Sequence, residues 1–145
     1  MGVQIIGYDK MNQLRTLDFL RDSEHTREIM RHHAEILRRK FEIVANALRN
    51  NLGECGFADW TNPRGGYFVS FNTLAGCAKA TFNLAKEAGL TMTGAGAAFP
   101  YGNDPEDRNI RIAPTSVDDK QLALAMEVFT VCVKLAAVNK LLEAK

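Results

Sequence analysis

The chain has 145 residues, of which 46% are hydrophobic and 24% are charged. That composition supplies enough apolar surface for one hydrophobic core and excludes an intrinsically disordered protein. With 18 basic and 17 acidic residues, the net charge of +1 provides no broad field for binding nucleic acid or an anionic membrane surface.

Two helices are predicted in the first part of the chain. A short helix is expected from about Asp9 to Leu20, and Asp22-Ser23 offers an N-cap for a long helix from about Glu24 to Leu52. Residues of the long helix recur at three- and four-residue intervals, namely Ile29, His33, Ile36, Leu37, Phe41, Val44, Leu48 and Leu52. Gly53 is a natural stop for it.

The length of the second helix has a consequence for its apolar face. At about 40 Å, it is too long to be covered by a small domain alone. Exposed apolar surface is therefore expected near Ile29 to Leu37, unless the first helix folds back over it as an antiparallel hairpin. Such surface, left uncovered, favours self-association.

After Gly56 the pattern changes to short strands and helices with proline and glycine punctuation. The predicted strands run over residues 58–61, 66–71, 90–93 and 109–112. The predicted helices run over residues 77–88 and from 118 to about 142, the second capped by Ser116 to Asp119. The fold class is α/β, more narrowly α+β: a small domain with a short, mostly antiparallel sheet packed by helices.

One arginine stands inside the last predicted strand. Side chains alternate along a strand, so Ile110 and Ile112 can face a core while Arg111 faces the other way. A guanidinium held there stays charged and matches a carboxylate or phosphate with two parallel hydrogen bonds. Three interpretations remain open: Arg111 binds a small anion, makes an ordinary structural ion pair, or is a snorkelling side chain at the sheet edge.

Three segments, taken in order, carry a family resemblance. They are Gly65 to Phe71 (Gly-Gly-Tyr-Phe-Val-Ser-Phe), Leu90 to Gly102, and Asn109 to Thr115 (Asn-Ile-Arg-Ile-Ala-Pro-Thr). Together they resemble the C-terminal part of fold type I, pyridoxal-phosphate-dependent aminotransferases, closest to the bacterial aspartate aminotransferase-like branch. Ile6 to Arg15 is similar to the segment that follows the cofactor lysine there, with Tyr8 where that branch usually has proline.

The resemblance implies a domain organisation and a function. Residues 1–22 are the end of the large-domain region, 23–53 the long connecting helix, and 54–145 the small C-terminal domain. The whole enzyme is expected to be a homodimer that uses pyridoxal 5'-phosphate to move an amino group between an amino acid, such as aspartate, and a 2-oxo acid. The lysine that holds the cofactor would precede Met1, so the chain alone is expected to be inactive.

The same resemblance assigns roles to particular residues. Arg111 is the expected clamp for the substrate α-carboxylate, and Asn12 falls in a stretch that lies near the subunit interface and the partner's active site. Arg108, in the polar loop before the strand, is the competing clamp, which a flexible position would make poorer. No residue of this chain is expected to be catalytic.

Two other hypotheses about the function of the chain remain open. It could be a free-standing α/β module that binds an anionic metabolite or a protein partner without chemistry, or a purely structural dimerisation piece. The first keeps Arg111 as an anion contact and needs no upstream lysine.

The cysteines and histidines indicate whether disulfides or a metal site are expected, and the apolar runs indicate whether a membrane span is expected. Cys55, Cys77 and Cys132 are odd in number and widely spaced, which favours free buried thiols over disulfides or a zinc site. His32 and His33 are adjacent, without further ligands at metal-binding spacing, so no metal is expected. No run approaches the roughly eighteen apolar residues that span a bilayer. A cytoplasmic protein without nucleic-acid or membrane partners is predicted.

Overall fold

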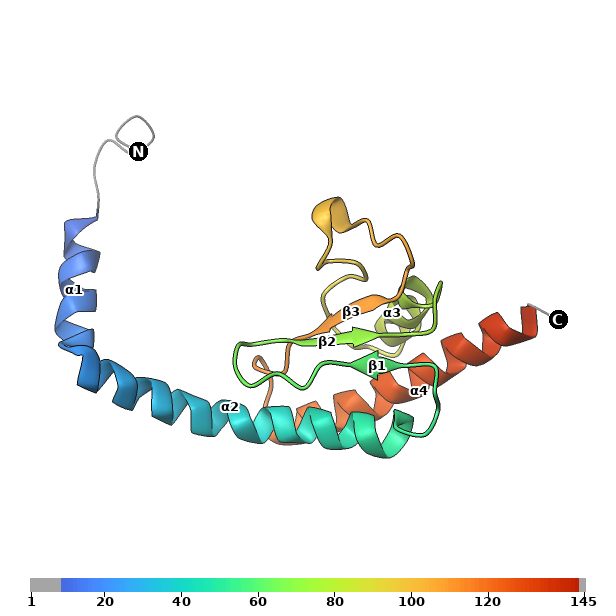
Figure 1. Ribbon diagram of the computed structural model, residues 1–145, viewed down its shortest axis with the longest axis horizontal. Helices are drawn as coiled ribbons and strands as arrows, with labels where there is room; N and C mark the ends of the chain where they lie inside the picture. The colour runs from blue at the N-terminus through green and yellow to red at the C-terminus, as the bar shows by residue number, and fades with distance from the viewer. Residues whose placement is uncertain (1–8, 144–145) are drawn as a thin grey trace. The chain divides into compact units, whose positions relative to one another are not determined.

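The computed structural model describes residues 9–143 (Figure 1). The segment Ile6 to Arg15 carries part of the family resemblance, and its first residues, Ile6 to Tyr8, lie outside the described residues. The elements in chain order are α1 (Lys10–Leu20), α2 (Ser23–Leu52), β1 (Asp59–Trp60), β2 (Val69–Asn72), α3 (Ala78–Glu87), the 3-10 turn η1 (Pro100–Gly102), β3 (Asn109–Ile112) and α4 (Asp119–Glu143). Two compact units divide the chain, residues 1–36 and 37–145, and their boundary falls inside α2.

Side-chain caps define where the first two helices begin. The backbone N–H of Asn12 donates to Asp9 Oδ1 at 3.0 Å. Asp22 Oδ1 accepts from the N–H groups of Glu24 at 2.9 Å and His25 at 2.8 Å. The hydrogen bond from His25 is the main reason that the pKa of the Asp22 carboxyl is lowered. Both predicted helix starts are confirmed, because each depends on a polar side chain next to the residues that it caps.

The first unit carries several exposed apolar side chains. None of residues 9–36 is buried, and Ile36 is 62% exposed. The other large exposed apolar residues of this unit are Met11, Leu14, Leu17, Phe19 and Met30. The predicted exposure near Ile29 to Leu37 is thus found at Ile36, and α1 does not cover α2 as a hairpin. Self-association of this surface stays a prediction.

The second unit is a three-stranded antiparallel sheet packed against helices (Figure 1). The strand order is β1-β2-β3. Phe71 of β2 is fully buried and contacts Trp60, with ring centroids 6.2 Å apart, and Phe129 of α4, at 5.2 Å. The core also takes residues from α2, β3 and α4: Val44, Leu48, Leu52, Ile110, Ile112, Leu122, Met126 and Val133. The predicted α+β class with a short antiparallel sheet is confirmed.

The predicted strand at residues 90–93 is wrong. This segment is irregular, because the backbone N–H of Leu90 turns back to the Ala85 carbonyl at 2.9 Å and closes the end of α3. Gly89, at φ +87°, permits that turn. Leu90 and Met92 still pack against the core through their side chains, so their apolar character reflects partial burial without strand pairing.

The prediction that no run is apolar enough for a membrane is wrong for α4. By length and composition alone this helix could cross a bilayer, with a mean hydropathy of 1.7 over 18 residues. Yet 44% of that window is buried inside the protein, and α4 contributes Leu122, Met126, Phe129 and Val133 to the core. One face of the helix builds that core, while its exposed side also carries apolar residues, namely Leu124, Val131, Leu135, Val138, Leu141 and Leu142.

The three cysteines are free, but they differ in burial. Cys77 and Cys132 are buried, as predicted, and burial raises the pKa of both thiols. Cys55 is exposed, which corrects the expectation of three buried thiols. It follows Gly53, after α2 has ended, where the chain has left the core.

Candidate functional site

The pairing of β2 with β3 gives the sheet one apolar and one polar face. Val69 pairs with Ile112 and Phe71 with Ile110, and these four side chains are buried in the core. The alternate pairs are Ser70 with Arg111 and Asn72 with Asn109. We call Ser70, Asn72, Asn109 and Arg111 the polar face. The predicted orientation of Arg111, opposite to that of its isoleucine neighbours, is confirmed.

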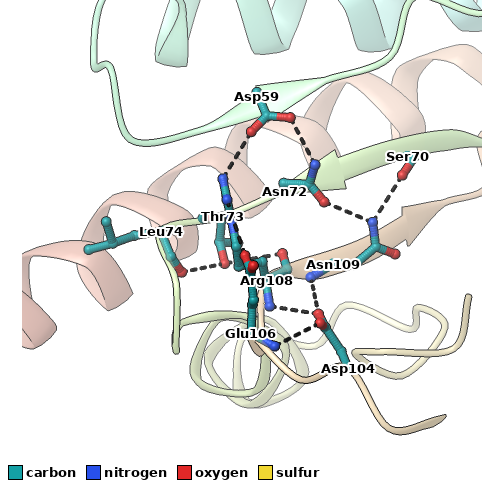
Figure 2. A network of polar contacts seen from close by, with 9 residues as sticks. All are labelled: Asp59, Ser70, Asn72, Thr73, Leu74, Asp104, Glu106, Arg108 and Asn109. Atoms are coloured by element: carbon teal, nitrogen blue, oxygen red, sulfur yellow. Dashed lines mark hydrogen bonds and ion pairs between the residues drawn. The ribbon is translucent and has the colours of Figure 1, made fainter. Parts of the chain in front are cut away.

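At one end of the polar face, amide side chains connect the three strands (Figure 2). Asn109 Nδ2 donates to Ser70 Oγ and to Asn72 Oδ1, both at 2.9 Å. Asn72 Nδ2 donates in turn to Asp59 Oδ1 of β1 at 2.8 Å. Asn109 is only 6% exposed, so these bonds compensate much of the cost of burying its amide. The network fixes the register two residues from Arg111.

Asp104 anchors the loop that leads into β3. Its carboxylate accepts from three backbone N–H groups, those of Glu106 at 3.1 Å and of Arg108 and Asn109 at 2.7 Å each (Figure 2). Desolvation acts to raise the pKa of the Asp104 carboxyl, but these donors outweigh it and hold the pKa below its ordinary value of 3.8. The start of β3 is therefore held by a charged carboxylate.

Arg108 is engaged on three sides. Its Nε donates to the Thr73 carbonyl at 3.0 Å, its Nη2 lies 3.0 Å from Asp59 Oδ2, and its Nη1 lies 3.4 Å from Glu106 Oε2 (Figure 2). The expectation that this loop arginine is flexible is thus corrected. Arg108 is a poor candidate for anion binding because two carboxylates already compensate its charge.

Arg111 is placed differently from Arg108. None of the ion pairs found within residues 9–143 involves it. Its Nε is buried and has no hydrogen-bond partner in the described part of the chain. Its guanidinium carbon lies over the Phe68 ring, 4.3 Å from the ring centroid. An uncompensated guanidinium with unused donors is suited to bind an anion.

Asn12, the other predicted site residue, is on α1 in the first unit. It is exposed, and its backbone carbonyl accepts from Thr16 Oγ1 at 2.8 Å. It borders an open depression whose lining comes only from α1 and its cap, namely Asp9, Asn12, Gln13, Thr16, Leu17 and Leu20. No compact unit contains both Asn12 and Arg111.

Sequence reasoning missed Phe68, Asp104 and Asn109 as parts of this site. A signal for Phe68 was present, because it alternates with the buried Val69 and so shares a face with Ser70. The pairing of Ser70 with Arg111 depends on the register, which the two strand sequences alone do not specify.

The chain is similar in sequence to known proteins of one family. The family model described as aspartate amino-transferase matches residues 1–145. The aspartate aminotransferase of Corynebacterium glutamicum is 43% identical over 136 residues, which are 94% of this chain and 32% of that protein. The chain spans about a third of the length of the relatives it matches.

Solved structures of aminotransferases are also similar to the chain. The crystal structure of an aspartate transaminase from Corynebacterium glutamicum has a TM-score of 0.91 at 42% identity, covering 96% of this chain and 33% of that one. The alpha-aminoadipate aminotransferase of Thermus thermophilus, complexed with N-(5'-phosphopyridoxyl)-L-leucine, has a TM-score of 0.69 at 22% identity, covering 88% and 31%. The second likeness concerns the fold alone.

Proposed function

The chain belongs to the aspartate aminotransferase family, and on that premise we propose that it is the substrate-carboxylate-binding part of an aminotransferase. The proposal concerns a longer enzyme, because the relatives are about three times as long as this chain. That enzyme moves an amino group between an amino acid, aspartate in the first place, and a 2-oxo acid such as 2-oxoglutarate.

The observation that carries the proposal is the contrast between two arginines. Arg108 is compensated by Asp59 and Glu106, whereas Arg111 has no ion pair among the residues described. Arg111 also stands on a strand whose register is held by the Asn109 network, so its backbone position is well defined. A fixed, uncompensated guanidinium on a sheet is suited to a small carboxylate.

In amino-group exchange, the same arginine can bind both the amino acid and the 2-oxo acid. Both the amino acid and the 2-oxo acid carry a carboxylate directly on the reacting carbon, which holds the amino group in one and the oxo group in the other. Two parallel hydrogen bonds from Arg111 therefore hold either substrate in the same orientation. Fixing a substrate in this way lowers the barrier of the chemical step, because the entropy of orientation is lost on binding.

Pyridoxal phosphate, when bound, supplies the electron-withdrawing ring that this reaction needs. The described residues do not build a site for it. Lys40 donates to the Val117 carbonyl and lies 3.8 Å from Asp119, and Lys134 is half-buried on α4. The remaining lysines within residues 9–143 are exposed, namely Lys10, Lys79, Lys86, Lys120 and Lys140. We therefore propose that the cofactor is held by the rest of the enzyme and that this chain alone is inactive.

We extend the proposal to the assembly and the compartment. The exposed apolar residues of α1, including Leu14 and Leu17, are typical of a surface covered in a larger assembly, which supports a homodimeric enzyme. In such a dimer, Asn12 approaches the partner's active site. The free thiols of Cys77 and Cys132 support a reducing, cytoplasmic compartment.

The test is Arg111→Lys in the full-length enzyme that contains this chain. Lysine keeps the charge but cannot form the two parallel hydrogen bonds. We expect kcat/KM for aspartate and for 2-oxoglutarate to fall by an amount equivalent to about 2 to 5 kcal/mol. Steady-state kinetics with each substrate varied in turn measures this.

Arg108→Lys in the same enzyme is the matched control. We expect it to change kcat/KM less than Arg111→Lys does, because its partners are Asp59, Glu106 and a backbone carbonyl of this chain. An unchanged kcat/KM in the Arg111→Lys enzyme would remove Arg111 from the substrate site.

A further inference from the structure

The ring of Phe68 is the one described side chain that lies against the face of the Arg111 guanidinium. We propose that Phe68 is a positioning residue, which orients this guanidinium so that its in-plane donors face the substrate carboxylate. The inference rests on the proposed function, because it takes Arg111 as the residue that binds the carboxylate.

The strand register explains why Phe68 and Arg111 meet. Ser70 is the direct partner of Arg111, and Phe68 lies two residues before Ser70, on the same side of the chain. Diagonal neighbours across two antiparallel strands are within reach of long and aromatic side chains. The 4.3 Å between the guanidinium carbon and the ring centroid is well inside the range of a cation–π interaction.

This contact orients the guanidinium without occupying its donors. The N–H groups of arginine point outward in the plane of the guanidinium, whereas an aromatic ring lies against the flat face. A carboxylate partner, such as Asp59 provides for Arg108, fixes the side chain but also compensates its charge and uses its N–H groups. Phe68 therefore restricts the motion of the Arg111 side chain and leaves its charge and its N–H groups available to bind a carboxylate.

The exposure of the Phe68 side chain indicates that it does not mainly fill the hydrophobic core. The ring that fills the core from this strand is Phe71, which is fully buried, while Phe68 is 46% exposed. Tyr67, the preceding residue, is 59% exposed and has no aromatic or cation–π contact within residues 9–143. The two neighbouring rings thus differ in their contact with Arg111, and Tyr67 is a matched control.

The experiment replaces Phe68 in the full-length enzyme and measures kcat and KM for an amino acid and a 2-oxo acid. In Phe68→Leu we expect KM for both substrates to rise about twofold to thirtyfold, the range of a lost cation–π interaction, with a smaller change in kcat. Phe68→Tyr keeps the ring and is expected to restore the wild-type KM. Tyr67→Leu is expected to leave both KM values unchanged.

Further variants keep the two proposals separate. Phe68→Met fills a similar volume without a ring, and it replaces Phe68→Leu if that enzyme does not fold. An unchanged KM in both Phe68→Leu and Phe68→Met, alongside a large loss in Arg111→Lys, would overturn the role of Phe68 and leave that of Arg111. An equal rise of KM in Tyr67→Leu or Phe68→Tyr would also overturn it. No loss in Arg111→Lys would overturn the proposed function itself.

Discussion

Arg108 and Arg111 are three residues apart, yet their surroundings give them different roles. Arg108 belongs to a loop that passes the end of β1, where Asp59 lies 3.0 Å from its guanidinium. Arg111 extends from the middle of β3 toward Phe68, and no carboxylate of the described chain pairs with it. The charge of the first stabilises the loop, and that of the second is available to a ligand.

The charged carboxylate of Asp104 is expected to stabilise the folded protein. Asp104→Asn removes the charge that accepts three backbone hydrogen bonds, so we expect the free energy of unfolding at pH 7 to fall by about 1 to 2 kcal/mol. Because the pKa of Asp104 is lower in the folded protein, its contribution is fully present above the ordinary value of 3.8. It is lost as the pH falls from there through the folded pKa.

Urea unfolding of both proteins at pH 7 and at pH 3 measures this effect. The difference between wild type and Asp104→Asn should be larger at pH 7 than at pH 3. Glu54→Gln is the control, because Glu54 is exposed and accepts no hydrogen bond in the part of the chain described. A difference that is the same at both pH values would contradict the role of the Asp104 charge.

At the scale of elements, α2 has one apolar repeat but two environments. Toward its C-terminal end, Val44, Leu48 and Leu52 are buried in the core of the second unit. Toward its N-terminal end, Ile36 is exposed and Ile29 is only half-buried. The repeat predicts which face of a helix is apolar, but it does not predict what covers that face along its length.

Two substitutions in this helix should therefore have unequal effects. Leu48 is 0% exposed, so Leu48→Ala should leave a cavity and lower the free energy of unfolding by about 2 to 5 kcal/mol. Ile36→Ala removes a mostly exposed side chain and introduces a better helix former, so we expect a change within about 0.5 kcal/mol. Urea unfolding followed by circular dichroism compares them, and a similar loss in both would contradict the exposure of Ile36.

At the scale of the whole molecule, all the buried side chains among residues 9–143 belong to the second unit. The first unit is helical through its caps at Asp9 and Asp22, but it adds no residue to the core. The stability of the chain should therefore come from residues 37–145, because burial of apolar surface is the main favourable contribution to folding.

Removing residues 1–36 tests this distribution of stability. We expect residues 37–145 to unfold in one cooperative transition, with a free energy of unfolding within about 1 kcal/mol of the whole chain, about the value of the lost helix cap. Urea unfolding followed by the fluorescence of Trp60 and by circular dichroism measures it. A truncated chain that does not fold would show that residues 1–36 stabilise the second unit.

The local features of this protein follow from residues that are close together in the sequence. The caps at Asp22 and Asp118 join residues three positions apart, so the segments that contain them could be predicted as caps. The alternation in β3 likewise predicted that Arg111 faces away from Ile110 and Ile112. The family motifs also needed only the order of residues, and the family match over the whole chain agrees with them.

Contacts between residues far apart in the sequence depend on the tertiary packing. Asp59 and Arg108 are 49 positions apart in the sequence, and Phe68 reaches Arg111 only because Ser70 is the pairing partner of that arginine. The apolar segment at residues 90–93 packs against the core without joining the sheet. The physical reason is that alternation and capping depend on neighbours along the chain, whereas strand register and charge compensation depend on packing between segments far apart in it.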